Sequence, residues 1–173
     1  MRSDRTMAVA YTALMAALVF VATYLIKIPN PATGGYSHMG DCMIFLAVVM
    51  LGRRSGSIAA AIGGALSDLL AGAAAWVAPT LIIKFAMAFI MGTVIEKAPM
   101  AGRRQLAGAA AGGIFQIAAY TLVKIVMIGA GPAVLSIPNV TIQTVVGIVL
   151  FAALVNVLMW HAPALFRIRG EVK

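Results

Sequence analysis

CMIFLAVVMLGRR, residues 42–54, decides how many times this chain passes through a membrane. Its apolar part, residues 42–51, is about half as long as the ~20 residues that a transmembrane helix needs. Two arginines, Arg53 and Arg54, follow it after Gly52. The other apolar segments are longer and cover residues 7–28, 55–77, 80–95, 106–129 and 140–160. Whether the short run crosses therefore sets the orientation of every segment after it.

The composition points to lipid as the main solvent of this chain. Of its 173 residues, 62% are hydrophobic and only 10% are charged, whereas a soluble domain carries about 25% charged residues. The net charge of +8 would suit nucleic acid. Here, however, the cations cluster between apolar runs, as they do in membrane proteins. We therefore expect a lipid bilayer, and no nucleic acid, as a partner.

The distribution of Lys and Arg indicates whether the short apolar run, residues 42–51, crosses the membrane. Ten of the 13 basic residues fall in four clusters: Arg2 and Arg5; Arg53 and Arg54; Lys97, Arg103 and Arg104; Arg167, Arg169 and Lys173. These clusters can all be cytoplasmic only if the short run crosses. The alternate connections, around residues 29–41, 72–79 and 130–139, contain no Lys or Arg, and Asp41 is their only charge. The sequence predicts an all-α integral membrane protein with six transmembrane helices, both termini cytoplasmic and a second helix beginning near Met39.

We expect a single domain over residues 1–173, because no connection is long or charged enough to be a linker. Internal repeats and paired broken helices are not apparent, which disfavours an inverted-repeat secondary transporter.

Two helices carry ladders with a spacing of four residues, which places the members of each ladder along one helix face. The small members allow close helix packing in a membrane, and the polar members lie toward the outer end. The ladders are Gly56, Ala60, Gly64, Asp68 and Gly72, and Gly108, Gly112, Gln116, Tyr120 and Lys124.

Polar side chains gather in the outer half of the expected bundle, which indicates a binding cup open on that side. Simpler roles stay open: Asp41 as a helix cap, Asp68 in a packing ion pair, and Lys84 and Lys124 snorkelling to the interface. Tyr36 and Trp76 could be interfacial belt residues. The outer-half set is Asp41, Asp68, Lys84, Gln116, Tyr120, Lys124, Asn139 and Gln143.

The motifs of common enzymes do not occur. The chain has no G-x-x-x-x-G-K-[ST], H-E-x-x-H or G-x-S-x-G sequence. His38 and His161 belong to opposite ends of the bundle and cannot share a metal, and the lone Cys42 cannot form an intrachain disulfide. We expect no enzyme activity, no metal and no cofactor.

The first helix carries a stripe of small residues, Ala10, Ala13 and Ala17. Such a stripe invites close packing with another helix. From the residues alone, that helix could belong to this chain or to another protein.

Two stretches identify a family resemblance: SHMGDCMIFLAVVMLGRRSGSIAAAIGGALSDLLAG, residues 37–72, and WVAPTLIIKFAMAFIMG, residues 76–92. The chain resembles the substrate-binding S component of energy-coupling factor (ECF) vitamin transporters, in the branch of riboflavin-type and hydroxymethylpyrimidine–pyridoxine-type proteins. The resemblance covers nearly the whole chain.

This resemblance implies high-affinity capture of one vitamin at the extracellular face, with the loop after the first helix as a gate. It also implies docking through an A-x-x-x-A motif, here Ala13 and Ala17, on a transmembrane coupling subunit. Two ATPases would drive uptake across a bacterial plasma membrane.

The resemblance also implies ligand contacts from the outer loops and helix ends. An extensive aromatic box for a two- or three-ring vitamin is missing, so we expect hydroxymethylpyrimidine or a pyridoxine vitamer, with riboflavin as the alternative. Other hypotheses are an ion-coupled secondary carrier relaying protons through Asp41 or Asp68, and a small membrane enzyme using His38 and Asp41. The implied contacts are Tyr36, His38, Asp41, Trp76, Lys84, Gln116, Tyr120, Lys124, Asn139 and Gln143.

Overall fold

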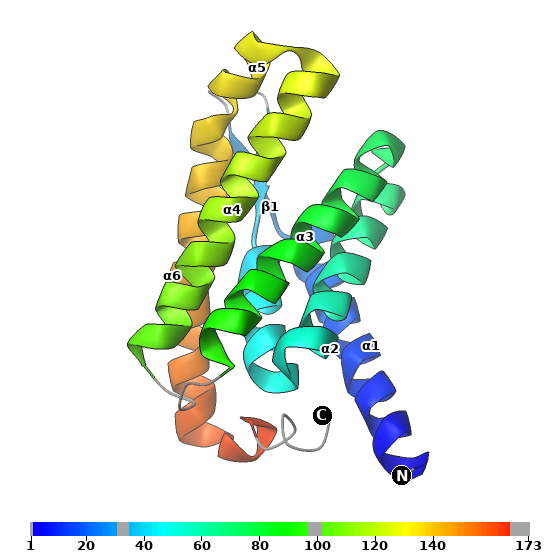
Figure 1. The fold of residues 1–173 in the computed structure, drawn as a ribbon, viewed down its shortest axis with the longest axis vertical. Helices are drawn as coiled ribbons and strands as arrows, with labels where there is room; N and C mark the ends of the chain where they lie inside the picture. The colour runs from blue at the N-terminus through cyan, green and yellow to red at the C-terminus, as the bar shows by residue number, and fades with distance from the viewer. Residues whose placement is uncertain (1, 31–34, 97–101, 167–173) are drawn as a thin grey trace.

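A computed structural model describes residues 2–30, 35–96 and 102–166 and shows a bundle of helices (Figure 1). Two short strands, β1 (Lys27–Asn30) and β2 (Gly35–His38), pair as an antiparallel hairpin. The helical fold is as predicted, and the hairpin is an addition that the sequence pattern did not indicate. The helices are α1 (Arg2–Tyr24), α2 (Gly40–Leu70), α3 (Ala74–Ile95), α4 (Arg103–Ile128), α5 (Ala130–Leu135) and α6 (Ile137–His161), followed by the 3₁₀ turn η1 (Pro163–Phe166).

Helix α2 contains a reversal that the sequence pattern located correctly. Gly52 has φ 82° and ψ −179°, a conformation essentially restricted to glycine. A short arm, residues 40–51, runs toward the end of the bundle where α1 begins, and a long arm, residues 53–70, returns (Figure 1). By length and composition, five helices of the described chain could cross a membrane when α2 counts once. Six passes, with the two arms of α2 counted separately, stay the prediction of the charge pattern.

The short arm of α2 lies at the centre of the bundle. At 1.5 Å per residue it spans only about 18 Å, less than the ~30 Å hydrocarbon core of a bilayer. All its residues except Met43 are buried, and Phe45 meets the ring of Phe151 from α6 at a centroid distance of 5.7 Å. The arm is therefore enclosed by the other helices, and it begins inside the protein, below the end of the bundle that carries the hairpin.

The two arms of α2 touch at Gly56. A Cβ atom at this position would lie 2.6 Å from the Cα of Val48. We expect Gly56→Ala to lower the free energy of unfolding by about 1–3 kcal/mol, since backbone cannot move aside cheaply. Denaturant unfolding in detergent measures the change. Gly131→Ala is the matched control, because a Cβ there meets nothing within 4 Å, and equal stability of the two variants would contradict the contact.

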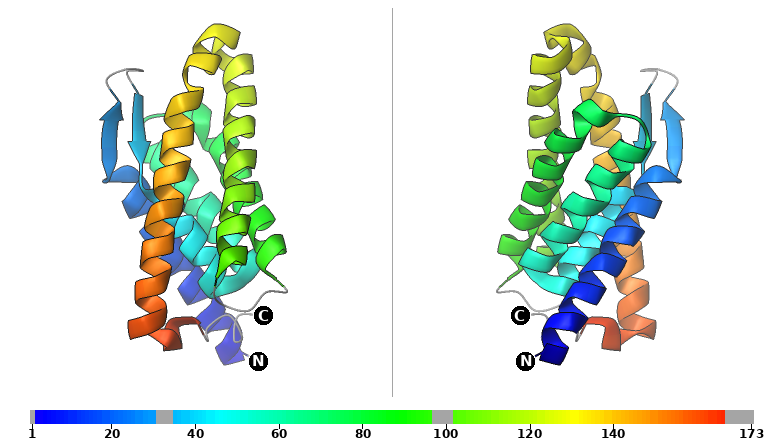
Figure 2. Two further views of the ribbon diagram at one scale, coloured as in Figure 1. Left: turned by 90° about the vertical axis from the view of Figure 1, so that its left-hand side faces the viewer. Right: turned by 90° about the vertical axis from the view of Figure 1, so that its right-hand side faces the viewer.

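The ends of the bundle separate two sets of connections (Figure 2). The hairpin, the α2–α3 turn and α5 gather at one end, and the Gly52 reversal, the start of α1 and η1 lie at the other. Arg53 at this second end forms an ion pair with Glu96, at 3.0 Å, and covers the ring of Phe89. Of the other predicted cytoplasmic residues, Lys97, Arg167, Arg169 and Lys173 lie outside the described residues. The cytoplasmic location of this end stays a prediction.

The boundary between α2 and α3 differs from the predicted one. The chain turns at residues 71–73, where Gly72 has φ 75°, and not near residue 78. Gly72 therefore belongs to the turn rather than to the helical ladder, and Pro79 lies inside α3. Trp76, expected in a loop, is consequently in the first turn of α3, and α5 replaces the predicted loop before α6.

Candidate ligand-binding site

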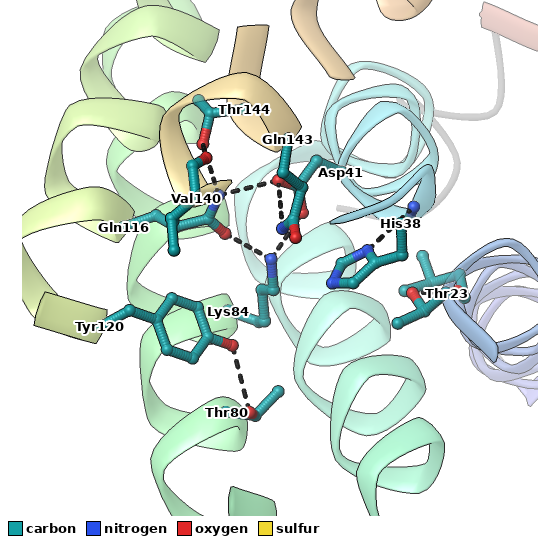
Figure 3. Close-up of polar contacts among 12 residues, drawn as sticks. Thr23, His38, Asp41, Thr80, Lys84, Gln116, Tyr120, Val140, Gln143 and Thr144 are labelled. Carbon is teal, nitrogen blue, oxygen red and sulfur yellow. Dashed lines mark hydrogen bonds and ion pairs between the residues drawn. The ribbon is translucent and has the colours of Figure 1, made fainter. Parts of the chain in front are cut away.

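A buried ion pair lies at the centre of the bundle (Figure 3). Asp41 is in the first turn of α2 and Lys84 in the middle of α3, and their Oδ1 and Nζ atoms are 2.5 Å apart. Their side chains are 0% and 1% exposed. Asp41 lies in the first turn of α2, after the N-cap residue Met39, yet its carboxylate contacts Lys84 of another helix, and Lys84 does not snorkel to an interface. The recessed start of the short arm explains both, because it carries Asp41 down to the level of Lys84.

Two glutamines complete this network from the other side of the bundle. Gln116 of α4 donates from Nε2 to Asp41 Oδ2, at 2.7 Å, and its Oε1 accepts a hydrogen bond from Lys84. Gln143 of α6 donates from Nε2 to the same Asp41 oxygen, at 3.1 Å. The Gln116 amide also donates to Thr144 Oγ1, at 2.8 Å. Four helices are thereby joined around a pair with no net charge.

The backbone of α6 leaves room for the network. A Cβ atom at Gly147 would lie 2.7 Å from Asp41 Cβ, so this glycine lets α6 approach the start of α2. Thr144, one turn earlier, donates to the carbonyl of Val140 at 2.9 Å and accepts from Gln116. Thr144 was not predicted as a site residue, although it follows Gln143 directly.

A cavity of about 180 Å³ lies beside this network. Six of the ten predicted contact residues line it, while Asp41, Lys84 and Gln116 are packed in the network and are not among the lining residues. Tyr36 is in β2, paired with Pro29, and its side chain lies outside the described part of the structure. The lining residues are His38, Asp68, Ala73, Trp76, Thr80, Tyr120, Lys124, Asn139, Val140 and Gln143.

One wall of the cavity is aromatic. The rings of Trp76 and Tyr120 are tilted, with centroids 6.2 Å apart. Tyr120 donates to Thr80 Oγ1 at 3.1 Å, and the Lys84 ammonium lies 5.6 Å from its ring centroid, within range of a cation–π interaction. The wall is therefore held in place by the network beside it. Thr80, one turn before Lys84 on α3, was not predicted as a site residue.

Charged and polar groups surround this aromatic wall. Lys124 is partly buried and donates to Ser136 Oγ at 2.9 Å. Asp68, near the end of α2, and Asn139, near the start of α6, also line the cavity. His38 accepts a hydrogen bond at Nδ1 from the Gly40 backbone, at 3.3 Å, which ties the hairpin to the start of α2. These groups place hydrogen-bond donors and acceptors on the wall of the cavity.

A second surface feature lies on the outside of α1. An apolar groove of about 600 Å³ runs between α1 and the long arm of α2, and Ala13 and Ala17 are exposed in it. The groove is lined by Ala8, Val9, Thr12, Ala13, Ala16, Ala17, Phe20, Ser55, Ile58, Ile62 and Leu66.

The fold and site define a class: a helical protein with apolar helices long enough to cross a membrane and a polar-lined cavity toward one end of its bundle. A family model for the ECF-type riboflavin transporter, S component, matches residues 3–159, and the chain belongs to this family. It is therefore a multi-pass membrane protein and the vitamin-binding subunit of an ECF transporter, not an enzyme.

A curated relative shares much of this sequence. A Pyrococcus woesei protein described as "Uncharacterized protein in gap 3'region" is 38% identical over 132 residues, which cover 76% of this chain and 88% of the relative.

Proposed function

We propose that this S component captures a polar one-ring vitamin or precursor, hydroxymethylpyrimidine or a pyridoxine vitamer, in the cavity beside the Asp41–Lys84 network. The observation that carries this proposal is the size of the cavity, about 180 Å³, with one aromatic pair on its wall. Ligand pockets for larger molecules usually measure about 300–1,000 Å³. The aromatic wall and the amides of Asn139 and Gln143 line this cavity together, a combination suited to a single ring with polar substituents.

Riboflavin is the second candidate, and the description of the matched family favours it. Its three-ring system would need a larger cavity than the one beside Trp76, so its binding would require the hairpin or the start of α3 to move outward. Hydroxymethylpyrimidine and pyridoxine require no such movement.

The proposed orientation follows from the charge pattern. With the arginine-bearing end of the bundle in the cytoplasm, the cavity opens to the extracellular face of a bacterial plasma membrane. The energy-coupling partners would be a transmembrane coupling subunit and two ATPases. The exposed Ala13 and Ala17 in the α1 groove are suited to close contact with a helix of the coupling subunit.

Trp76 provides a direct test of the cavity. We expect the bound vitamin to change the intrinsic fluorescence of the purified protein, because Trp76 lines the cavity. A titration with hydroxymethylpyrimidine, pyridoxine and riboflavin would rank the three ligands. Trp160 is the matched control, since it is 84% exposed near the other end of α6.

In Trp160→Phe the fluorescence change should persist, and in Trp76→Phe it should vanish. Riboflavin binding at least tenfold tighter than either one-ring ligand would overturn the one-ring proposal. A ligand-induced change that depends on Trp160 would place the site elsewhere.

A further inference from the structure

The buried network controls which way the amide of Gln143 faces. The Asp41 carboxylate, paired with the Lys84 ammonium, can only accept hydrogen bonds. Gln143 must therefore direct its NH₂ group at Asp41, as the 3.1 Å contact from Nε2 to Oδ2 shows. The opposite orientation would bring two acceptor oxygens together.

The other members of the network are occupied by one another. The Gln116 amide donates to Asp41 and Thr144 and accepts from Lys84. The Lys84 ammonium contacts Asp41, Gln116 and the ring of Tyr120. Both side chains are almost completely buried, with exposures of 0% for Gln116 and 1% for Lys84. Neither needs a ligand to satisfy its polar atoms.

Gln143 is different, because it belongs both to the network and to the lining of the cavity. Its Nε2 is committed to Asp41. Among the residues that the structure describes, none donates a hydrogen bond to its Oε1. This oxygen is also not one of the fully buried side-chain atoms that lack a hydrogen-bond partner. The polar atom that Gln143 leaves for a molecule in the cavity is thus its carbonyl oxygen.

We propose that Gln143 is a specificity-determining residue that presents a hydrogen-bond acceptor to the ligand, and that Asp41 and Lys84 are positioning residues that fix its orientation. The ligand is consequently a heteroaromatic molecule with an N–H or O–H donor on the edge that faces α6. This inference rests on the proposed function, namely that the cavity is the vitamin site. Asp41, Lys84 and Gln116 then act on the ligand through Gln143 and Tyr120 rather than by contact.

Ligand pairs that differ at a donor test the proposal in the wild-type protein. The pairs are hydroxymethylpyrimidine and its 4-dimethylamino analogue, pyridoxine and its 3-O-methyl ether, and riboflavin and 3-methylriboflavin. We consider the pair whose unmethylated ligand binds to the protein. In that pair, we expect the methylated ligand to bind at least about tenfold more weakly, because the Gln143 Oε1 acceptor, which the ligand buries, loses its hydrogen-bond partner. Equal affinities within that pair would overturn the inference while leaving the proposed function intact. Absence of binding by all three parents would overturn both.

Two variants separate the hydrogen bond from the bulk of the added methyl groups. Gln143→Leu removes the acceptor at similar side-chain volume. The ratio of the two affinities within the ligand pair should then fall to the value that the bulk of the methyl groups alone produces. The double variant Asp41→Asn, Lys84→Met retains the Gln143 side chain, but its amide can rotate so that Oε1 and Nε2 exchange places. The affinity ratio within the ligand pair should fall as far as it does in Gln143→Leu. Undiminished discrimination in either variant would refute the proposed role.

Thermal unfolding and capture by the coupling subunit serve as the structural readouts. A residue needed only for folding would lower the melting temperature and weaken both members of a ligand pair by the same factor. If the double variant does not fold, the comparison of wild type with Gln143→Leu still decides the role of the acceptor.

Discussion

Replacing Lys84 by methionine is expected to lower the free energy of unfolding by about 3–5 kcal/mol, because it leaves the Asp41 carboxylate buried without its counter-charge. The substitution also removes the donor to Gln116 Oε1. Asp41 is 0% exposed, so water cannot replace the ammonium. Unfolding by denaturant in detergent micelles, followed by circular dichroism, measures the effect.

The neutral double variant Asp41→Asn, Lys84→Met is the control for this prediction. Exchange of a complete buried ion pair for neutral groups is often close to neutral in stability, so the double variant should regain most of the lost free energy. If Lys84→Met alone is as stable as the wild type, the pair is not buried as described.

The second large effect concerns the groove on α1. We expect the double substitution Ala13→Trp, Ala17→Trp to abolish ATP-driven uptake in cells that carry the coupling subunit and ATPases, because two indole rings would prevent close helix contact. Vitamin affinity of the purified variant should stay at the wild-type value, since the groove and the cavity are lined by different residues.

The matched control places the same bulk on another lipid-facing helix. Val145 and Val149 of α6 are 53% and 62% exposed and are also four residues apart. Their replacement by tryptophan should leave uptake unchanged. Loss of vitamin binding in the α1 variant, or equal loss of uptake in the α6 variant, would contradict a docking role for Ala13 and Ala17.

The sequence was most informative where charge and periodicity constrain the chain. The arginines after residues 42–51 predicted the reversal at Gly52, although this arm alone is too short to span a bilayer. The four-residue ladder on α4 placed Gln116 and Tyr120 on one face, and the structure brings both toward Lys84. These features follow from local geometry and could be derived without a structure.

Other features depend on depth in the bundle, which periodicity does not encode. Asp41 was expected in the connection around residues 29–41, but the short arm starts inside the protein and buries it beside Lys84. Thr80 and Thr144 were missed for the same reason, since a threonine in an apolar helix carries no signal until its neighbours are known. The hairpin formed by β1 and β2 also escaped prediction, because a strand pair of this length has no clear alternation.

Native mass spectrometry can show whether this chain captures a one-ring vitamin. The protein is purified without its partners and supplied with an equimolar mixture of hydroxymethylpyrimidine, pyridoxine and riboflavin. We expect a complex with one equivalent of a one-ring ligand. A complex with riboflavin alone, or no complex with any of the three, would contradict it.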